Sequence, residues 1–367
     1  MPPLRTAPGR VPRAGPALAG APTGTSSYGR RTTVPESRAT LADIAERAGV
    51  SLAAASLAVR GKPGVGDTTR QRVLDIAHEL DYRARSSTSS PGAIGVLVRA
   101  RERDHIESDA FYGSVIAGIT EECATIDADL RLDSLTVDDQ LNPVSTPRLV
   151  EAPHIRGFLV LGTFVSAETI RLLSRWPVVL VDSYTAEPGM FPGVVSDNMG
   201  GTAAATSRLI GLGHRRIALV GTNPAAFPSI LERRDGYTRT MLAEGLEPWY
   251  IDGQHHTPGP CVAAAVQALD QEPPPTAFVT ANDAVALELM GELRDRVPRQ
   301  VSIIGFDDIE AASLMRPRLD TVAVDTRAMG RLAVSMLRHR LTHPDDAVFT
   351  AVQGASLVVR DTTAPPP

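Results

Sequence analysis

Residues 39–61 of the chain read Ala-Thr-Leu-Ala-Asp-Ile-Ala-Glu-Arg-Ala-Gly-Val-Ser-Leu-Ala-Ala-Ala-Ser-Leu-Ala-Val-Arg-Gly. Thr40, with Asp43 three residues later, is typical of a helix N-cap with an acid in the first turn, because free backbone amides and the helix dipole favour negative charge there. A helix is therefore predicted to begin at this point. Its apolar residues recur with the helical period and share one face: Leu41, Ile44, Ala45 and Ala48.

A turn and a second helix follow this first helix. Gly49 is predicted to end the first helix, because glycine tolerates the left-handed backbone that a tight turn requires. Val50 supplies an apolar plug between the two helices. Ser51 is the predicted N-cap of the second helix, which is expected to end at Arg60, before Gly61.

A third helix, capped by Asp67, is predicted after the turn at residues 62–64. Short helices, a glycine turn and small alanines that allow close approach are typical of a helix-turn-helix, which presents one helix to the DNA major groove. The alternative is an alanine-rich helical hairpin within a larger core. The expected core members of the second and third helices are Ala55, Ala58, Val59, Val73, Ile76, Ala77 and Leu80.

These residues resemble the N-terminal domain of the lactose/galactose repressor (LacI/GalR) family of bacterial transcription regulators. The resemblance rests on motifs such as Ala48-Gly49-Val50-Ser51 and Leu80-Asp81-Tyr82, and later motifs extend it from Ala39 to Arg360. It implies a DNA-binding domain over residues 39–85 that reads its site with few polar side chains, through contacts to thymine methyls and through DNA shape. The residues expected to contact DNA are Thr40, Ser51, Leu52, Ala53, Ser56, Leu57 and Arg60.

Composition and charge agree with this interpretation. The length of 367 residues suits a small domain plus one or two larger ones. Residues 1–90 hold 13 of the 37 Arg and Lys but only 7 of the 42 acids, so the basic end is the predicted DNA end. The only cysteines, Cys123 and Cys261, exclude a disulfide framework and a cysteine-rich zinc site. With no signal-peptide core and no apolar run that could span a bilayer, a cytoplasmic protein, associated with the nucleoid when it binds DNA, is expected.

Two segments flank the predicted DNA-binding domain. Residues 1–38 are rich in Pro, Gly, Ser, Thr and Arg, and we expect a disordered extension there. Residues 86–92 are predicted to be a linker. Here the chain departs from the family, in which this position usually holds a hinge helix whose leucine enters the minor groove. The coupling between effector and DNA through this linker is therefore expected to be weak.

From Ala93 onward, continuous apolar runs alternate with helical segments, a pattern typical of parallel strands covered on both faces. Two such rounds in tandem predict an α/β body of two doubly wound lobes with a cleft between them, as in periplasmic sugar-binding proteins. Motifs such as Val195-Ser-Asp197-Asn198 and Gly305-Phe306-Asp307-Asp308 extend the family resemblance through this body. By that resemblance, residues 93–194 with 325–341 form the first lobe, and residues 195–324 with 342–362 form the second.

Ligands of open α/β sheets bind outside the carboxyl ends of the strands, where this chain carries Asp182, Asp283 and Asp307. By the resemblance, Arg233 binds ligand hydroxyls or a carboxylate and these acids accept from hydroxyls, a chemistry that suits a small polyol effector, most simply a sugar. Each acid has the alternative role of a helix cap or hinge hydrogen bond, and the two aromatics expected at the site could instead pack under the lobe. The expected ligand-binding residues are Phe111, Tyr112, Asp182, Arg233, His255, Asp283 and Asp307.

Other chemistries find little support in the sequence. His255-His256 lacks further ligands at metal spacing, and His214 is interpreted as a structural loop histidine, so we predict no metal site. We expect no cofactor and no enzymatic activity, because neither a dinucleotide-binding glycine motif nor a catalytic constellation is present. The predicted function is a DNA-binding transcriptional regulator, most simply a repressor. The alternatives are a sugar-binding protein without regulatory DNA binding, and a two-lobe enzyme.

The predicted partners are double-stranded operator DNA, a small effector and a second copy of the chain. One small DNA-binding head buries too little DNA surface for tight specific binding, so a homodimer on a pseudo-palindromic operator is expected. The tail after Arg360 contains no heptads, and no tetramer through a C-terminal coiled coil is predicted.

Overall fold

The computed structural model describes residues 41–59, 64–80, 92–101, 110–185, 187, 189–253 and 258–367. The chain divides into two compact units, Met1–Thr88 and Ser89–Pro367. Among the described helices, none is long and apolar enough to cross a membrane. The predicted extension 1–38, nearly all of the predicted linker 86–92, and the candidate site residues Thr40, Arg60 and His255 lie outside the described residues.

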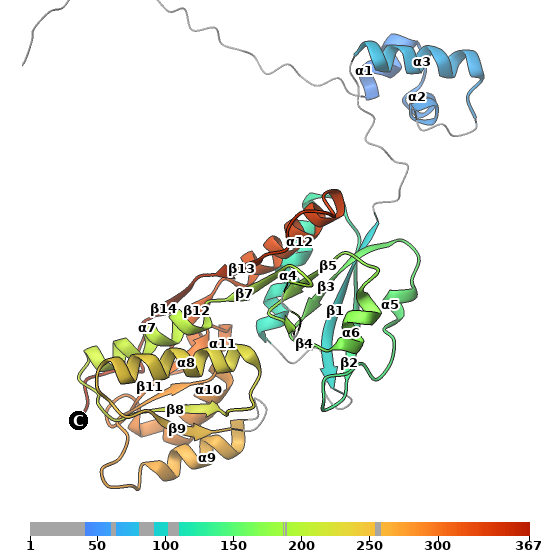
Figure 1. The fold of residues 1–367 in the computed structure, drawn as a ribbon. Coiled ribbons are helices and arrows are strands. Elements are labelled where there is room, and N and C mark those ends of the chain that lie inside the picture. The colour runs from blue at the N-terminus through green and yellow to red at the C-terminus, as the bar shows by residue number, and fades with distance from the viewer. Residues whose placement is uncertain are drawn as a thin grey trace, which may run out of the picture. The chain divides into compact units, whose positions relative to one another are not determined.

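The first unit contains the predicted helix-turn-helix, which we call the head (Figure 1). Gly49 has φ +64°, the left-handed backbone expected at the turn. The buried core confirms the predicted inner faces and consists of Ile44, Ala45, Ala48, Ala55, Ala58, Val73 and Ala77. Asp67 is the first residue of its helix rather than the cap before it, since the amide of Arg70 bonds the carbonyl of Gly66. The helices of the head are α1 Leu41–Ala48, α2 Leu52–Val59 and α3 Asp67–Glu79.

The second unit, which we call the body, has two lobes, each built on a six-stranded sheet. The first sheet has the order β13-β7-β5-β3-β1-β2 and is parallel throughout. Its strands are β1 Ala93–Arg101, β2 Leu130–Val137, β3 Ile155–Leu161, β5 Val178–Val181, β7 Gly193–Ser196 and β13 Thr350–Gln353, and a small separate ladder pairs β4 Phe164–Val165 with β6 Tyr184–Thr185.

Helices cover both faces of this first sheet, as continuous apolar strands require. On one face, α4 and α12 pack against each other and share a core with β1, β3 and β5. On the other face, α5 and α6 enclose a second core around Phe158 and Leu173. The helices of this lobe are α4 Ala110–Thr125, α5 Arg148–Glu151, α6 Ala167–Leu173 and α12 Thr326–Thr342.

The second sheet has the order β14-β12-β11-β10-β8-β9, with only β14 antiparallel to its neighbour. Helices α7 and α8 contribute to the core on one face, and α9 and α10 to the core on the other. The elements are α7 Asn198–Gly211, β8 Ile217–Thr222, α8 Pro228–Ala243, β9 Trp249–Asp252, α9 Pro258–Ala268, β10 Ala277–Thr280, α10 Asp283–Leu293, the 3-10 turn Arg294–Arg296, β11 Ser302–Asp307, α11 Glu310–Leu314, β12 Asp320–Val324 and β14 Ala355–Val358.

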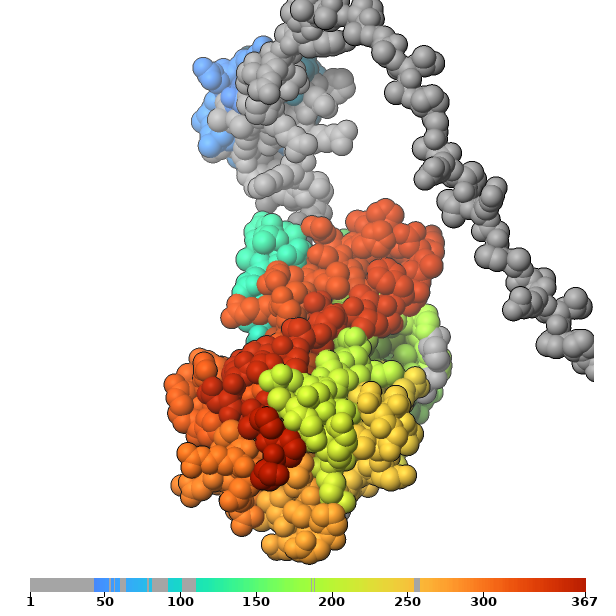
Figure 2. Space-filling model, turned by 90° about the vertical axis from the view of Figure 1, so that its left-hand side faces the viewer, coloured from blue at the N-terminus to red at the C-terminus, as the bar shows by residue number. Residues whose placement is uncertain are grey.

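The chain passes between the sheets after β7, after β12 and after β13. In Figure 2 the C-terminal segments, coloured red, run over the surface of the body from one lobe onto the other. The lobe boundaries differ from those predicted at two points. All of β7, to Ser196, lies in the first sheet, and β13 returns to that sheet at residues 350–353, because it pairs with β7 before Gly354 leads into β14.

Candidate functional site

The candidate DNA interface is built on α2 of the head. Ser51 caps this helix, since its hydroxyl oxygen accepts a hydrogen bond from the amide of Ala54 at 3.2 Å. Ala55 and Ala58 turn one side of α2 into the core. Leu52, in the first turn of α2, has an exposed fraction of 54%, although a large apolar side chain gains by burial. An exposed leucine in the first turn of this helix suits contact with a base edge.

The predicted contact residues share this helix, but their exposure differs. Ser51 and Leu52 are exposed, whereas Leu57 is half-buried near the turn at Gly64. Ala53 and Ser56 lie in α2 between them. The helix contains no Asp, Glu, Lys or Arg, so its own residues supply no charge for reading bases.

Arginines on α1 and α3 carry the kind of charge that phosphate contacts need. Arg47, in the last turn of α1, and Arg72, on α3, are both exposed. Arg70 donates to the carbonyl of Ala58 at 3.5 Å and so joins α3 to the end of α2. The sequence did not predict these arginines as contacts, because its predicted contacts are confined to Thr40 and residues 51–60. The head therefore pairs an uncharged reading helix with basic flanks.

In the body, Arg233 is the hub of a buried polar network. It is 5% exposed, although an arginine is almost never fully buried unless it is paired. Its guanidinium donates to Asn198 Oδ1 at 3.0 Å, to the carbonyl of Ala281 at 2.5 Å and to Asp307 Oδ1 at 3.2 Å. It also stacks 3.7 Å from the ring centre of Phe306. The expected pair Arg233 and Asp307 is therefore brought together, by bonds within the protein.

Around this hub, Asn198, Tyr184 and Glu232 link the two lobes. The Tyr184 hydroxyl, from β6 beside the first sheet, donates to Glu232 Oε2 on α8 at 2.9 Å. Asn198 Nδ2 donates to the same carboxylate oxygen at 2.9 Å and to the Tyr184 hydroxyl at 3.3 Å. Burial raises the pKa of Tyr184, and the charges of Asp182 and Glu232 add to this shift, so the hydroxyl stays a donor. The sequence pattern did not point to Tyr184 or Glu232.

Asp283 lies wholly inside the second lobe, with no exposed surface. Its Oδ1 accepts the hydroxyl of Thr321 at 2.5 Å, and its Oδ2 accepts the amide of Ile309 at 3.0 Å. Burial raises its pKa to about 7. In this position Asp283 holds the chain that follows β11 within the second lobe.

Tyr112 and Asp182 meet in the first lobe. The Tyr112 hydroxyl donates to Asp182 Oδ2 at 2.8 Å, and its ring lies over Gly162, where an added Cβ would approach the ring to 2.6 Å. Phe111 packs edge to face with Tyr112 and belongs to the core. Two of the expected ligand residues thus bond each other, and a third is core.

A cavity of about 270 Å³ opens between the lobes, at the carboxyl ends of β1 and β8. None of the expected ligand residues that the structure describes lines this cavity. Arg99, at the end of β1, forms its basic wall, and among the described residues none makes a hydrogen bond or ion pair with Arg99. Phe227 lines the cavity and packs edge to face against Tyr184, which joins the cavity to the interlobe network. The lining residues are Arg99, Asp139, Leu141, Phe164, Gly221, Asn223, Ala225, Ala226, Phe227, Pro228 and Ile230.

Comparison with known proteins agrees with both parts of this architecture. Residues 40–84 match the model of the bacterial regulatory proteins of the lacI family, and residues 206–363 match that of the periplasmic binding protein-like domain. The ribose operon repressor of Escherichia coli strain K12 is 30% identical over 322 residues, which cover 83% of this chain and 94% of the repressor.

Solved structures show the same arrangement. A complex of the transcriptional regulator CelR with cellobiose is 27% identical, with a TM-score of 0.63, and the match covers 89% of this chain and all of that one (100%). A lac repressor dimer bound to operator has the same fold, with 21% identity, a TM-score of 0.63 and the same coverage, 89% and 100%. With its helix-turn-helix head and its two-lobe body, this chain belongs to the LacI family of bacterial regulatory proteins.

Proposed function

We propose that this protein is a repressor that binds a pseudo-palindromic operator as a homodimer and that a small sugar between its lobes controls operator affinity. The observation that carries the DNA part is α2 itself, a capped helix that exposes Leu52 between basic flanks. Apolar contact with thymine methyls and DNA shape then supply the specificity, with phosphate contacts from the arginines nearby. Ser51, Leu52, Ala53, Ser56 and Leu57 remain the proposed contacts at this helix. Thr40, before α1 in the sequence, and Arg60, after α2, remain proposed contacts outside the described residues.

The cavity between the lobes carries the ligand part of the proposal. Its volume of about 270 Å³ is slightly below the usual range for ligand pockets, which favours a small ligand. Phe164 and Phe227 offer apolar faces for the C–H side of a sugar ring, while Arg99 can donate to hydroxyls and Asp139 can accept from them. The names of two relatives, a ribose operon repressor and a cellobiose-bound regulator, support a sugar as the class of ligand.

We propose that the expected ligand residues do not contact the sugar directly but support the wall of this cavity. Arg233 and Asp307 already bond each other, and Asp283 has both oxygens engaged. A sugar that contacts Arg233 directly has to replace one of its protein partners. We therefore propose Arg99 as the first ligand contact, with the Arg233 network fixing the geometry of the second-lobe wall.

Control of DNA binding follows from the two walls of the cavity. A sugar that touches Arg99 on the first lobe and Asn223 on the second favours one arrangement of the lobes over others. In a homodimer this arrangement sets the spacing of the two heads, so sugar and operator binding are linked. A coupling of about 1 to 3 kcal/mol changes operator affinity by roughly 5- to 150-fold.

Two further points belong to the proposal. A regulator of promoters acts where the chromosome is, so we place this protein in the bacterial cytoplasm, at the nucleoid when it is bound. We also propose that it catalyses no reaction, as its repressor relatives suggest.

Selection of genomic fragments on the purified full-length protein tests the DNA part. The account expects enriched sites that share a pseudo-palindrome with half-sites about 10 base pairs apart, or a multiple of this. Light scattering should show twice the chain mass of 39.0 kDa. A monomeric mass both free and on the selected DNA would contradict the dimer, and the absence of enriched sites would favour a sugar-binding protein without regulatory DNA binding.

Calorimetry with pentoses, hexoses and disaccharides tests the ligand part, beginning with ribose and cellobiose. Arg99→Gln should weaken sugar binding about 10- to 150-fold, because a hydrogen bond from a charged group contributes about 1.5 to 3 kcal/mol. Operator affinity without sugar should not change. Arg131→Gln, on the exposed edge of the same lobe, is the matched control. Equal sugar affinity in Arg99→Gln and wild type would show that the ligand lies elsewhere.

A further inference from the structure

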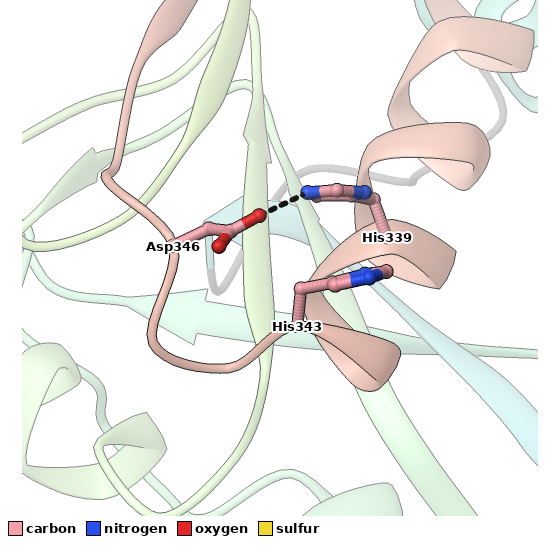
Figure 3. A group of neighbouring side chains, drawn as sticks. All are labelled: His339, His343 and Asp346. Atoms are coloured by element: carbon pink, nitrogen blue, oxygen red, sulfur yellow. Dashed lines mark hydrogen bonds and ion pairs between the residues drawn. The ribbon is translucent and has the colours of Figure 1, made fainter.

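The end of α12 brings together side chains that metal ions prefer. His339 and His343 are one helical turn apart, and the loop after the helix returns Asp346 beside them (Figure 3). One ligand atom from each residue lies within 4.8 Å of the other two, and all three residues are exposed. We propose that these residues bind a divalent first-row transition-metal ion, with Zn²⁺ as the best match to two imidazoles and a carboxylate.

The three ligand atoms are near one another, but the rings have to reorient to hold a metal. Tetrahedral zinc with bonds of about 2.1 Å places its ligand atoms about 3.4 Å from each other. His339 Nε2 and Asp346 Oδ2 are already 2.8 Å apart, and the two imidazole rings are stacked with centres 4.5 Å apart. Imidazole binds a metal in the plane of its ring, and the two ring planes are only 16° from parallel, so the His343 ring has to turn before both rings can face one ion. Its exposure leaves room for this turn.

The surroundings hold the loop that carries Asp346 and set the tautomer of His343. Arg340 donates to the backbone carbonyl of Asp346 at 2.8 Å and so holds the returning loop. The hydroxyl of Thr342 lies 2.9 Å from the carbonyl of His339, to which it donates. The same hydroxyl lies 2.8 Å from His343 Nδ1, which must then be the donor in that contact. This tautomer makes His343 Nε2 the metal-binding atom, and the ring has to turn for that atom to face Asp346, because Figure 3 shows the His343 ring extending away from it.

The position in the fold suits a structural role for this metal. The three ligands join the last turn of α12 to the segment that leads into β13. His339 and Asp346 also border an apolar cavity of about 210 Å³, lined by Met336 and Phe349 among others. A metal there would tie the end of α12 to the segment before β13. Water would complete the coordination of the metal. The site is independent of the proposed DNA and sugar sites.

The test is calorimetry of the untagged full-length protein with Zn²⁺ and Ni²⁺, with Mg²⁺ as a control that prefers oxygen ligands. Wild type should bind Zn²⁺ in the micromolar range or tighter and should melt at a higher temperature with it, because a metal that binds only the folded state stabilises that state. Replacement of Zn²⁺ by Co²⁺ should give a visible absorption band that reports nitrogen ligation directly.

His339→Gln, His343→Asn and Asp346→Asn should each lose one bound metal per chain, or weaken this binding at least 10-fold, since even loss of an outer-shell partner costs about 10- to 100-fold. The matched control is His154→Asn, which removes another exposed histidine of the first lobe. It should bind metal as wild type does. The proposal is overturned if wild type binds no Zn²⁺ in this range, or if the three site variants keep the wild-type stoichiometry and affinity.

Discussion

Among the described residues of the head, alanine supplies five of the seven buried core members, whereas the body buries side chains as large as Phe158, Tyr237, Phe278 and Phe306. The head contains little apolar surface, and its helices pack because small side chains let them approach closely. The body has apolar surface in excess and buries a charged hub, Arg233, among it. The comparison teaches that added side-chain volume should destabilise the head most. The loss of a buried polar partner should destabilise the body most.

The largest effect is expected from breaking the hub of the body. Arg233→Met keeps the approximate volume but removes the hydrogen bonds that Arg233 donates to Asp307, Asn198 and the carbonyl of Ala281. Removing one partner of a buried ion pair costs about 3 to 5 kcal/mol. Urea unfolding followed by tryptophan fluorescence measures this in the body alone, because both tryptophans, Trp176 and Trp249, lie there.

The control for this prediction is Arg239→Met, on the exposed side of the same helix α8. It should change the free energy of unfolding by less than about 0.5 kcal/mol. If the two variants unfold at the same urea concentration, the network around Arg233 contributes nothing to the body, and the contrast with the head is lost.

The complementary change adds volume to the head. Ala55 has no exposed surface, and Ala55→Leu should cost about 1 to 3 kcal/mol through overpacking. Hydrogen exchange of peptides from residues 41–80 should accelerate, while the unfolding of the body stays unchanged. Ala54→Leu, at a half-buried neighbouring position, is the control and should leave exchange close to that of wild type. Normal protection in Ala55→Leu would refute the tight packing of these helices.

The hub region should also respond to pH through Asp283. Its pKa is raised from 3.8 to about 7 in the folded body, so the folded state holds a proton that the unfolded chain has already released. Stability from this group is present below about pH 4 and is lost as the pH rises towards 7, by at most about 1.4 kcal/mol per pH unit. The body of Asp283→Asn should be less stable overall. Its stability should no longer fall between pH 5 and pH 7 through this group, as a comparison of urea midpoints at the two pH values would show. An unchanged slope would exclude Asp283 as its source.

The smallest effect is expected at the link between the lobes. Tyr184→Phe removes the hydroxyl that joins Glu232 and Asn198, which should cost about 1 kcal/mol. A double-mutant cycle with Glu232→Ala isolates this contact by tryptophan fluorescence. Additive effects of the two changes would show that the hydrogen bond between β6 and α8 carries no coupling.

Much of the fold was predictable because its signals are local. Gly49, Ser51 and the apolar stripe around Ile44 mark the helix-turn-helix, and runs such as Val178–Val181 mark buried strands. Strand β2 has no continuous apolar run to mark it in the sequence, because it lies at the sheet edge, where Arg131 and Asp133 interrupt the apolar pattern. Strand β13 was missed because nothing before residue 350 shows that the chain returns to the first sheet.

The candidate site was less predictable, because it depends on which strand ends converge. The acids at strand ends were recognised from position, and Arg233 does meet Asp307. The pairing of Tyr184 with Glu232 joins residues 48 positions apart on different lobes, and no local pattern reports it. The sequence alone predicted no metal site, because Asp346 meets His339 and His343 only through the turn at the end of α12.

The central claim is that α2 reads the operator, and Leu52→Asp tests it most directly. Gel shifts at one fixed salt concentration should compare this variant with wild type and with Leu74→Asp, which places the same charge on an exposed leucine of α3. The account predicts that Leu52→Asp loses specific binding to the selected operator, down to the affinity for random DNA, while Leu74→Asp keeps most of it and both heads remain folded. Unchanged operator affinity in Leu52→Asp would contradict the account.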